Sequence, residues 1–298
     1  MKEKIRDLIS SINNVILGNE KQVELAVICL LSSGNLLIED LPGTGKSTLS
    51  RALAKSFGLD FKSVHFTNDL LPSDLIGINI FKSETSSFIF EKGPIFSNVL
   101  LADELNRASP RTQSALLEAM NSNEINVDGE QMQLPTPFFV IASQNPLSQV
   151  GTSPLPESQL DRFLMRISLG TPSRDSEKRI LKGKKVLVDS INEIISIQDL
   201  LEIQNYIDNL EFSDELYEYI LDLLAESRKL KSGGLSTRAA IGIVNASKAC
   251  AFIKGDKTIL PDHVQFIFSS VTEHRLDNGF KEEVLISENI LRKVDAIR

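Results

Sequence analysis

The stretch "LIEDLPGTGKSTLS", residues 37–50, constrains the fold more than any other part of the chain. It follows the phosphate-loop pattern GxxxxGK[ST] through Gly45, Lys46 and Ser47, but Asp40 stands where the first glycine is expected. An apolar strand, a glycine-bearing turn and a helix beginning at Lys46 would aim several backbone N–H groups at one point, which suits a polyphosphate. We therefore predict a nucleotide site in which the Asp40 carboxylate points away from the phosphates, on a backbone with ordinary angles.

The residues of this loop have roles that follow from their chemistry. Gly43 and Gly45 let the backbone approach the phosphates closely, Lys46 can reach the β- and γ-phosphates, and the Ser47 hydroxyl can ligate Mg²⁺. The predicted cofactor-binding residues of the loop are Pro42, Gly43, Thr44, Gly45, Lys46, Ser47 and Thr48. A turn rich in small residues before an amphipathic helix is the alternative interpretation of the same pattern.

Two acidic residues and one amide at strand ends complete the predicted site. "NVLLADE" is an apolar strand candidate ending in Asp103 and Glu104, and "PFFVIASQN" is another, ending in Asn145. A magnesium nucleotide needs a carboxylate to hold the metal, and hydrolysis needs a base or polariser for the attacking water. Asp103 fits the first role and Glu104 the second, while Asn145 can orient the water or touch the γ-phosphate without adding negative charge. The alternatives are a solvated acidic pair and a turn residue.

The order of apolar runs predicts an α/β fold with a parallel sheet, followed by a helical region. The strand candidates are "NLLIED", "FKSVHFT", "SNVLLADE" and "PFFVIASQ", and they alternate with helical patterns. Later segments are periodic at helical spacing, with Ser213 and Ser236 as predicted N-caps. We therefore predict an α/β nucleotide-binding domain over residues 1–172 and a smaller all-helical domain over residues 173–298.

Composition narrows the classes of partner and site. The 298 residues carry a formal net charge of −8, which argues against a surface that binds nucleic acid by charge alone. No apolar run approaches the ~18 residues of a membrane span, so we expect a cytoplasmic protein. Cys29 and Cys250 fall in apolar helical patterns, which favours two buried thiols over a disulfide. Because His65, His263 and His274 lack metal-ligand spacing, no zinc site is predicted.

With these motifs in order, the chain resembles the MoxR family of AAA+ ATPases. The resemblance rests on "EDLPGTGK", "FTNDLLPSDLIG", "GPIFSNVLLADELNRASPRTQSALLEAM", "LPESQLDRF" and "LSTRAAI", and it covers nearly the whole chain. "EDLPGTGK" also occurs in that family, which makes Asp40 a variant of a working loop. The resemblance implies an AAA+ phosphate-loop domain followed by a helical lid, ATP and Mg²⁺ as cofactors, and a homo-oligomeric ring, expected to be a hexamer. It further implies chaperone-like remodelling or maturation of a client protein, with a separate partner that carries a von Willebrand factor A domain.

The resemblance also implies roles for residues outside the loop. In "VILGNEK", Val15, Ile16 and Gly18 match the segment that packs on the adenine base. In "LPESQLDRF", Arg162 matches the arginine finger, which in such rings reaches the γ-phosphate bound by the neighbouring subunit. In "STRAAI", Arg238 matches the second sensor. Each arginine has a surface ion pair as its alternative. The rivals of Arg162 for the finger role are Arg107 and Arg166.

Two further stretches are predicted to form hairpins. "GINIFKSETSSFIFEKGP" lies in the position of the family's helix-2 insert, and "EINVDGEQMQL" would turn at Asp128 and Gly129. In related rings such hairpins face the central channel or the client. The alternative is that each is only a solvent-exposed hairpin.

Three rival functions stay open at this point. A helicase-type nucleic-acid motor would carry a basic stripe on the hairpins, but the second hairpin has Glu124, Asp128 and Glu130 and no lysine or arginine. A nucleotide-gated binding switch that hydrolyses slowly is a second rival, and intact Glu104 and Asn145 speak against it. A magnesium-chelatase-like motor subunit is the third, and only its partner would distinguish it.

Overall fold

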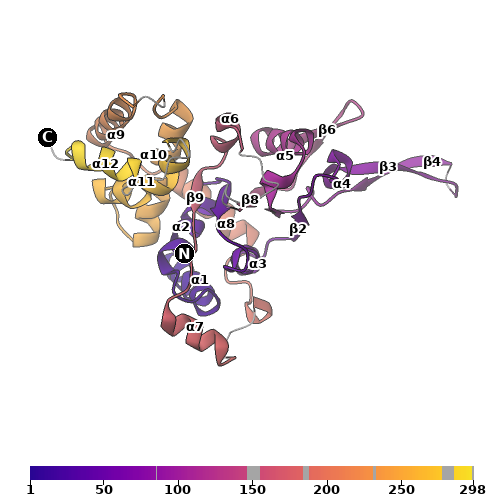
Figure 1. The fold of residues 1–298 in the computed structure, drawn as a ribbon, viewed down its shortest axis with the longest axis horizontal. Helices are drawn as coiled ribbons and strands as arrows, with labels where there is room; N and C mark the ends of the chain where they lie inside the picture. The colour runs from indigo at the N-terminus through magenta and orange to yellow at the C-terminus, as the bar shows by residue number, and fades with distance from the viewer. Residues whose placement is uncertain (85, 146–154, 184–187, 231–232, 277–284, 297–298) are drawn as a thin grey trace.

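The computed structural model describes residues 1–84, 86–145, 155–183, 188–230, 233–276 and 285–296 (Figure 1). At its centre lies a five-stranded parallel sheet with the order β2-β5-β8-β1-β9. The strands are β1 (Leu36–Glu39), β2 (Phe61–His65), β5 (Val99–Asp103), β8 (Phe139–Gln144) and β9 (Met165–Ile167). The four strands predicted from the sequence are confirmed, and β8 pairs with β1.

The fifth strand, β9, was not predicted. It has three residues, with Arg166 at its centre, and it pairs with β1 alone. A run this short shows no periodic pattern, and its pairing partner lies far away in the sequence. Only the folded sheet reveals it.

Both faces of the central strands β1, β5 and β8 are buried, and successive side chains of each strand point to opposite faces. In β1, Leu36 and Ile38 belong to one hydrophobic cluster and Leu37 to the other. The first cluster includes residues of α1 (Lys2–Val15), α2 (Glu20–Leu31) and α3 (Lys46–Ser56), and the second includes residues of α4 (Pro72–Ile76) and α5 (Pro110–Ser122). Polar side chains that serve a ligand are therefore confined to the ends of the strands.

The C-terminal part is helical, as predicted. Its helices are α7 (Arg174–Leu181), α8 (Ile197–Asp208), α9 (Asp214–Ser227), α10 (Thr237–Lys254), α11 (Pro261–Leu276) and α12 (Ile286–Lys293), with a 3₁₀ turn η2 (Val188–Ser190). The predicted N-caps Ser213 and Ser236 accept hydrogen bonds from the N–H groups of Leu216 and Ala239. The position of the domain boundary stays a prediction. Among the described helices, none has both the length and the apolar character needed to cross a membrane.

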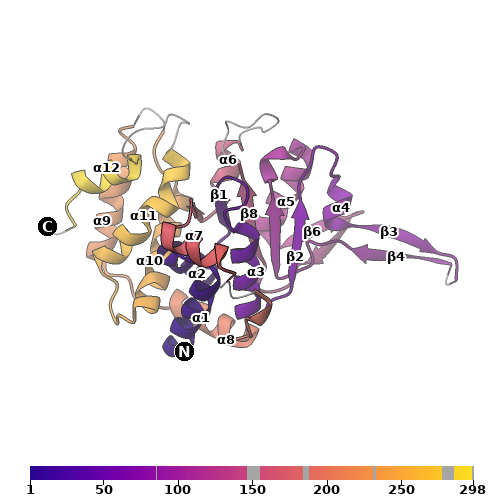
Figure 2. The same cartoon turned by 60° about the horizontal axis from the view of Figure 1, so that its bottom comes forward.

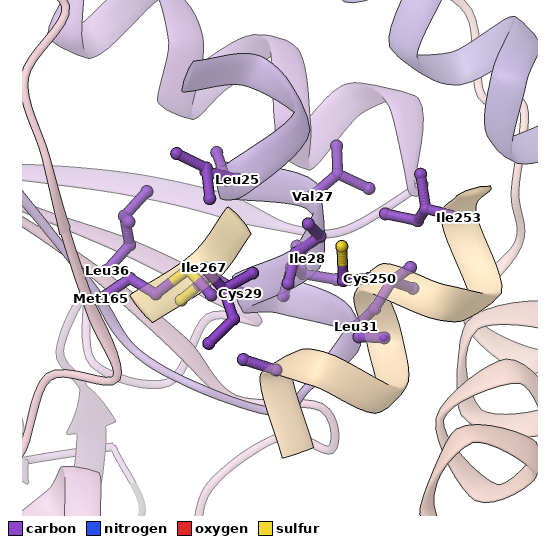
Figure 3. Close-up of a cluster of buried hydrophobic side chains, with 14 of the residues drawn as sticks. Leu25, Val27, Ile28, Cys29, Leu31, Leu36, Met165, Cys250, Ile253 and Ile267 are labelled. Carbon is purple, nitrogen blue, oxygen red and sulfur yellow. The ribbon is translucent and has the colours of Figure 1, made fainter. Parts of the chain in front are cut away.

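The helical part and the sheet share one continuous hydrophobic core. Figure 3 shows Cys29 of α2 toward Leu36 and Met165 at the sheet edge, and Cys250 of α10 beside Ile28 of α2. Both cysteines are free and buried, as predicted. Burial raises the pKa of Cys250 to about 12, and burial also raises the pKa of Cys29. Both sulfurs therefore stay protonated and pack as small apolar groups.

Two hairpins extend this body, and both predictions of a hairpin are confirmed. β3 (Gly77–Lys82) pairs with β4 (Ser87–Lys92), and β6 (Glu124–Val127) pairs with β7 (Glu130–Gln133). The second turns at Asp128 and Gly129, whose φ angles are 53° and 91°. Figures 1 and 2 show the β3–β4 hairpin projecting away from the sheet. The Asn79 amide of β3 donates to Asp128 Oδ2 at 2.6 Å, so the two hairpins are linked.

Asp40, at the end of β1, ties this strand to the chain that follows β9. Its Oδ1 accepts hydrogen bonds from Ser168 Oγ at 2.8 Å and Gly170 N at 3.1 Å, and its Oδ2 accepts one from Leu169 N at 2.5 Å. The residue is buried, with 7% exposure, and its φ is not positive. The carboxylate therefore points to the 168–170 segment, and the position does not require glycine.

Replacing Asp40 by the glycine of the strict motif is expected to destabilise the protein. Asp40→Gly leaves buried N–H groups without acceptors, so the free energy of unfolding should fall by about 1–3 kcal/mol. Asp40→Asn keeps one acceptor oxygen and should lose less. Urea unfolding of both variants measures the difference. An unchanged or higher stability of Asp40→Gly would show that the carboxylate does not hold the strand end.

Candidate active site

The phosphate loop connects β1 to α3 and opens onto a cavity. Gly45, the N-cap of α3, has a φ of 100° and Gly43 has a φ of 85°, conformations that glycine adopts without strain. The first N–H groups of α3 have no intrahelical acceptor and are free for a ligand. The cavity has a volume of about 300 Å³. Its lining is formed by Pro42, Gly43, Gly45, Lys46, Ser47, Thr48, Asp103, Glu104 and Asn145.

One predicted loop residue lies outside this lining. Thr44 is half-buried, and its Oγ1 donates to the carbonyl of Leu41 at 3.2 Å. Thr44 can still contribute its backbone to the loop. The remaining loop residues and the three strand-end residues are brought together as the sequence predicts.

Three of these side chains form one hydrogen-bonded chain. Lys46 Nζ donates to Asn145 Oδ1 at 3.2 Å, and Asn145 Nδ2 donates to Glu104 Oε1 at 2.9 Å. Lys46 Nζ also donates to the carbonyl of Asp40 at 2.7 Å. The amide of Asn145 thus connects Lys46 to Glu104 by hydrogen bonds. The three side chains follow β1, β8 and β5 in the chain, and these strands are adjacent in the sheet.

The charge of Lys46 is held in a buried position. Burial lowers the pKa of its ammonium group, and the carboxylates of Asp103, Asp40 and Glu104 oppose that shift. A polyphosphate in the cavity would add negative charge close to Nζ and would favour the protonated form further. The ammonium group of Lys46 is therefore positioned to form an ion pair with an anionic ligand in the cavity.

Asp103 and Glu104 are oriented by a buried serine that the sequence reasoning missed. Ser143 Oγ donates to Asp103 Oδ1 at 2.5 Å and accepts a hydrogen bond from Glu104 N at 2.9 Å. Ser143 has no exposed surface. A hydroxyl inside the apolar run of β8 was the available signal, because buried polar groups need partners.

Glu104 follows β5 with a φ of 56°, in the left-handed region. Its Oε2 accepts a hydrogen bond from Arg107 Nη1 at 2.5 Å and lies 3.5 Å from His65 Nε2. Burial alone would raise the pKa of Glu104, but hydrogen bonds from Arg107 and Asn145 outweigh it, so the pKa lies below the ordinary value. The side chain is therefore an anion, suited to orienting and polarising a water molecule. His65, at the end of β2, is a second residue that was missed.

The residues predicted to hold Mg²⁺ fit that ion. Ser47 and Asp103 line the same cavity and offer a hydroxyl and a carboxylate oxygen. Mg²⁺ prefers oxygen ligands and is usually held by one or two carboxylates together with substrate phosphates. Asp103 Oδ2 also lies 3.4 Å from His65 Nδ1.

The residues assigned to the adenine base lie apart from the cavity lining. Val15 and Ile16 are buried in the main hydrophobic cluster, with 4% and 6% exposure. Gly18 has a φ of 80°, and a Cβ there would lie 2.8 Å from Ser176 Oγ of α7. The segment therefore packs closely against the start of α7, and its contact with a base stays a prediction.

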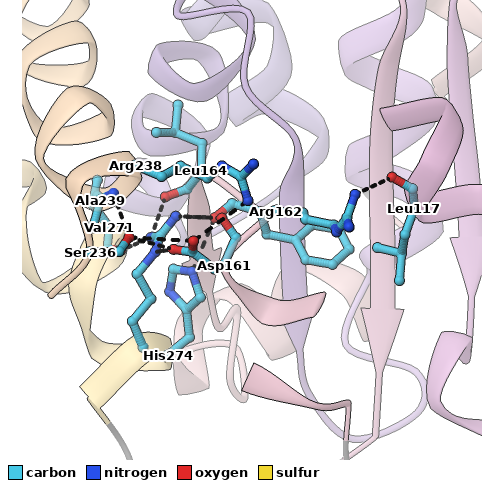
Figure 4. Close-up of polar contacts among 11 residues, drawn as sticks. Leu117, Asp161, Arg162, Leu164, Ser236, Arg238, Ala239, Val271 and His274 are labelled. Carbon is cyan, nitrogen blue, oxygen red and sulfur yellow. Dashed lines mark hydrogen bonds and ion pairs between the residues drawn. The ribbon is translucent and has the colours of Figure 1, made fainter. Parts of the chain in front are cut away.

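The predicted arginines also lie outside the cavity lining, in the region shown in Figure 4. Arg162 follows α6 (Glu157–Leu160), and its Nη1 donates to the carbonyl of Leu117 in α5 at 2.8 Å. Its Nε is buried and has no hydrogen-bond partner among the described residues. Arg238 is 55% exposed, and its Nη1 lies 3.6 Å from Asp161 Oδ2. The two arginines are thus on either side of Asp161.

The two rivals of Arg162 are paired with carboxylates of their own chain. Arg107 contacts Glu104 from the 3₁₀ turn η1 (Leu105–Arg107), and Arg166 Nη1 lies 2.9 Å from Glu39 Oε2. A third arginine, Arg275 of α11, was missed by the sequence reasoning. Its Nε donates to Asp161 Oδ1 at 2.8 Å. An arginine at the end of a helical pattern carries no signal of such a contact.

Comparisons with known proteins agree with this geometry. Residues 35–165 match the model of the ATPase family associated with various cellular activities (AAA), and residues 225–294 match the AAA lid domain. The chain is 35% identical over 279 residues to chaperone MoxR1 of Mycobacterium tuberculosis, and the matched region covers 90% of this chain and 74% of that protein. The chain belongs to the MoxR family of AAA ATPases.

Further relatives of this MoxR-family chain extend over nearly its full length. It is 40% identical over 292 residues to the uncharacterized protein YeaC of Bacillus subtilis, covering 96% of this chain and 91% of that protein. A crystal structure of a proposed ATPase from Cytophaga hutchinsonii superposes with a TM-score of 0.88 at 36% identity, covering 99% of this chain and 95% of that one. The predicted α/β domain followed by a helical lid is confirmed as the architecture of this MoxR-family protein.

Lys46→Ala is expected to weaken nucleotide binding by about 10-fold or more, because it removes a buried cation from the phosphate cavity. Equilibrium titration with a fluorescent ATP analogue measures the affinity. Lys55→Ala is the matched control, since Lys55 lies on the same helix but forms an exposed ion pair with Asp189. Equal affinities in the wild type and Lys46→Ala would contradict the assignment of the loop.

Proposed function

We propose that this protein hydrolyses ATP with Mg²⁺ at the boundaries between subunits of a ring and uses the energy to remodel a partner protein. The observation that carries the proposal is the hydrogen-bonded chain of Lys46, Asn145 and Glu104 along one wall of the phosphate cavity. A phosphate cation, a neutral amide and an anionic carboxylate in contact are the groups that phosphoryl transfer to water requires.

Each side chain has a distinct task in this proposal. Lys46 exchanges its contacts with the Asp40 carbonyl and Asn145 for the β- and γ-phosphates. Asn145 then orients the attacking water, and Glu104 accepts a hydrogen bond from it. Ser47 and Asp103 would hold Mg²⁺, which would supply positive charge to offset the charge that develops on the phosphates.

The cavity needs a further cation for efficient hydrolysis. Among the described residues, no arginine is part of its lining. An arginine at the transferred phosphate is worth about 10³ to 10⁵ in rate in comparable systems. Arg162 of a neighbouring subunit supplies it in our proposal, because Arg107 and Arg166 each have a carboxylate partner in their own chain. A ring, with the hexamer as the expected size, follows from this shared site.

A protein client is favoured over nucleic acid by the surface of the hairpins. Phe81 and Phe88 of the β3–β4 hairpin are 54% and 70% exposed, and the centroids of their rings lie 5.3 Å apart. The groove beside them includes Asp128 and Glu130, and no lysine or arginine of the described part of the chain lines it. Exposed aromatic groups suit the apolar side chains of a polypeptide, and the carboxylates beside them repel phosphates. The name of the relative chaperone MoxR1 supports a protein client. A protein with a von Willebrand factor A domain is the proposed partner, on the family resemblance alone.

Glu104→Gln is expected to bind ATP with unchanged affinity and to lower kcat by about 10²- to 10⁴-fold, because it removes the carboxylate that polarises the water. Steady-state phosphate release and nucleotide titration measure the two effects. Glu218→Gln, at an exposed position of α9, is the control and should retain full turnover. Wild-type turnover in Glu104→Gln would remove Glu104 from this role.

Arg162→Ala is expected to bind ATP but to lose ring-dependent hydrolysis, by about 10³-fold or more. Adding Lys46→Ala subunits, which still present Arg162 to a neighbour, should restore hydrolysis by the Arg162→Ala subunits. Light scattering on the same samples measures the mass of the mixed rings. If mixed rings form and no activity returns, Arg162 does not act across a subunit boundary.

A further inference from the structure

The strongest polar assembly outside the phosphate cavity surrounds Arg275, on the lid helix α11 (Figure 4). Its side chain is 6% exposed. Nε donates to Asp161 Oδ1 at 2.8 Å, and Nη2 donates to the carbonyls of Asp161 at 3.2 Å and Phe163 at 2.8 Å. Nη1 donates to the carbonyls of Leu164 at 3.3 Å and of Val271. Every N–H donor of the guanidinium therefore has an acceptor.

Most of these acceptors belong to the turn that carries Arg162. The carbonyls of Asp161, Phe163 and Leu164 flank Arg162 on both sides, so the turn is held through its backbone. His274, next to Arg275, adds a contact from its Nε2 to the Phe163 carbonyl at 3.1 Å. Burial, with the charge of Arg275, holds the pKa of His274 well below its usual range, so the ring is neutral and Nε2 can be its donor.

Asp161 joins this assembly to a second lid helix. Its Oδ1 also accepts from Ser236 Oγ, the N-cap of α10, at 3.1 Å. Arg238, at the start of α10, lies 3.6 Å from its Oδ2. One carboxylate therefore contacts both lid helices and stands directly before Arg162 in the chain.

We propose that Arg275 is a positioning residue, which fixes the direction in which the Arg162 side chain leaves the turn. Because Arg275 belongs to the lid, the position that the Arg162 side chain can reach then depends on the position of the lid. The inference rests on the proposed function, in which Arg162 acts on ATP bound by a neighbour. The backbone carbonyls set the path of the chain on either side of Arg162. A displacement of about 1 Å in a group that contacts reacting atoms can lower a rate by about 10²-fold.

The alternative role for Arg275 is to balance the charge of Asp161 within the fold. The two roles differ in what a lysine can replace. Lysine retains the positive charge and can pair with Asp161, but its ammonium lacks the planar fork that holds several carbonyls at once. Arg275→Lys therefore keeps the charge that balances Asp161 but loses the fork that holds the carbonyls, whereas Arg275→Gln loses both.

The test measures ATP affinity, kcat and ring mass for Arg275→Lys, Arg275→Gln and Arg162→Ala, each alone and mixed with Lys46→Ala subunits. Both Arg275 variants are expected to retain ATP affinity and ring mass, to lose about 10- to 100-fold in kcat, and to regain hydrolysis in the mixtures. Arg292→Gln, an exposed lid arginine 3.8 Å from Glu288, is the matched control and should behave as wild type.

Hydrogen exchange followed by mass spectrometry tests the clamp itself. Peptides that cover residues 157–167 should exchange faster in Arg275→Lys and Arg275→Gln than in Arg292→Gln, while peptides of α10 keep their protection. Unchanged exchange in 157–167 would overturn the proposal whatever the activities are. General loss of protection across the lid would assign Arg275 to folding alone and would also overturn it.

The activity results distinguish this proposal from the function it rests on. Wild-type kcat in Arg275→Lys would show a charge-balancing role and overturn the proposal alone. The proposal alone would also be overturned if Lys46→Ala subunits restore hydrolysis by Arg162→Ala but do not restore hydrolysis by the Arg275 variants. If Arg162→Ala itself retains wild-type turnover, or is not restored in rings of confirmed mixed composition, the proposed trans function fails, and the positioning role fails with it.

Discussion

The central strands β1, β5 and β8 of the parallel sheet are buried on both faces, which leaves their ends for polar chemistry, and the candidate active site depends on that constraint. The alternation of Leu36, Leu37 and Ile38 sends side chains into two separate hydrophobic clusters. Functional groups must then follow the last apolar residue of each strand. Glu104 and Asn145 directly follow the neighbouring strands β5 and β8, and Lys46 begins the helix after the loop that leaves β1, which explains how residues far apart in the sequence form one hydrogen-bonded chain.

The site residues that could be predicted from the sequence are those that belong to short, contiguous motifs. The loop around Lys46 and the acidic pair after β5 are short motifs whose meaning depends on a strand before them and a turn or helix after them. Ser143 is different, because its contacts to Asp103 and Glu104 arise from the pairing of β5 with β8. Strand order is a property of the whole sheet, and no local pattern encodes it.

The arginines show a second limit of sequence reasoning. Arg162 and Arg238 were assigned by resemblance, and the structure places both beside Asp161, away from the phosphate cavity lining of their own chain. Arg275 has no motif, yet it has more contacts to the Arg162 turn than any residue that was predicted. A buried guanidinium is recognised only when its acceptors are known, and all of these except the Val271 carbonyl lie more than a hundred residues earlier in the chain.

The strand β9 connects the two halves of the proposed mechanism. At its start, the carbonyl of Leu164 is held by Arg275 of the lid, and beyond its end, Ser168, Leu169 and Gly170 are held by Asp40 of the phosphate loop. Between these contacts β9 pairs with β1, the strand that leads into the loop. A movement of the phosphate loop must either break the Asp40 contacts or carry β9 with it. In the second case the Arg162 turn moves too, because it is continuous with β9. The Asp40 contacts and the pairing of β1 with β9 therefore join the phosphate loop to the turn that carries Arg162.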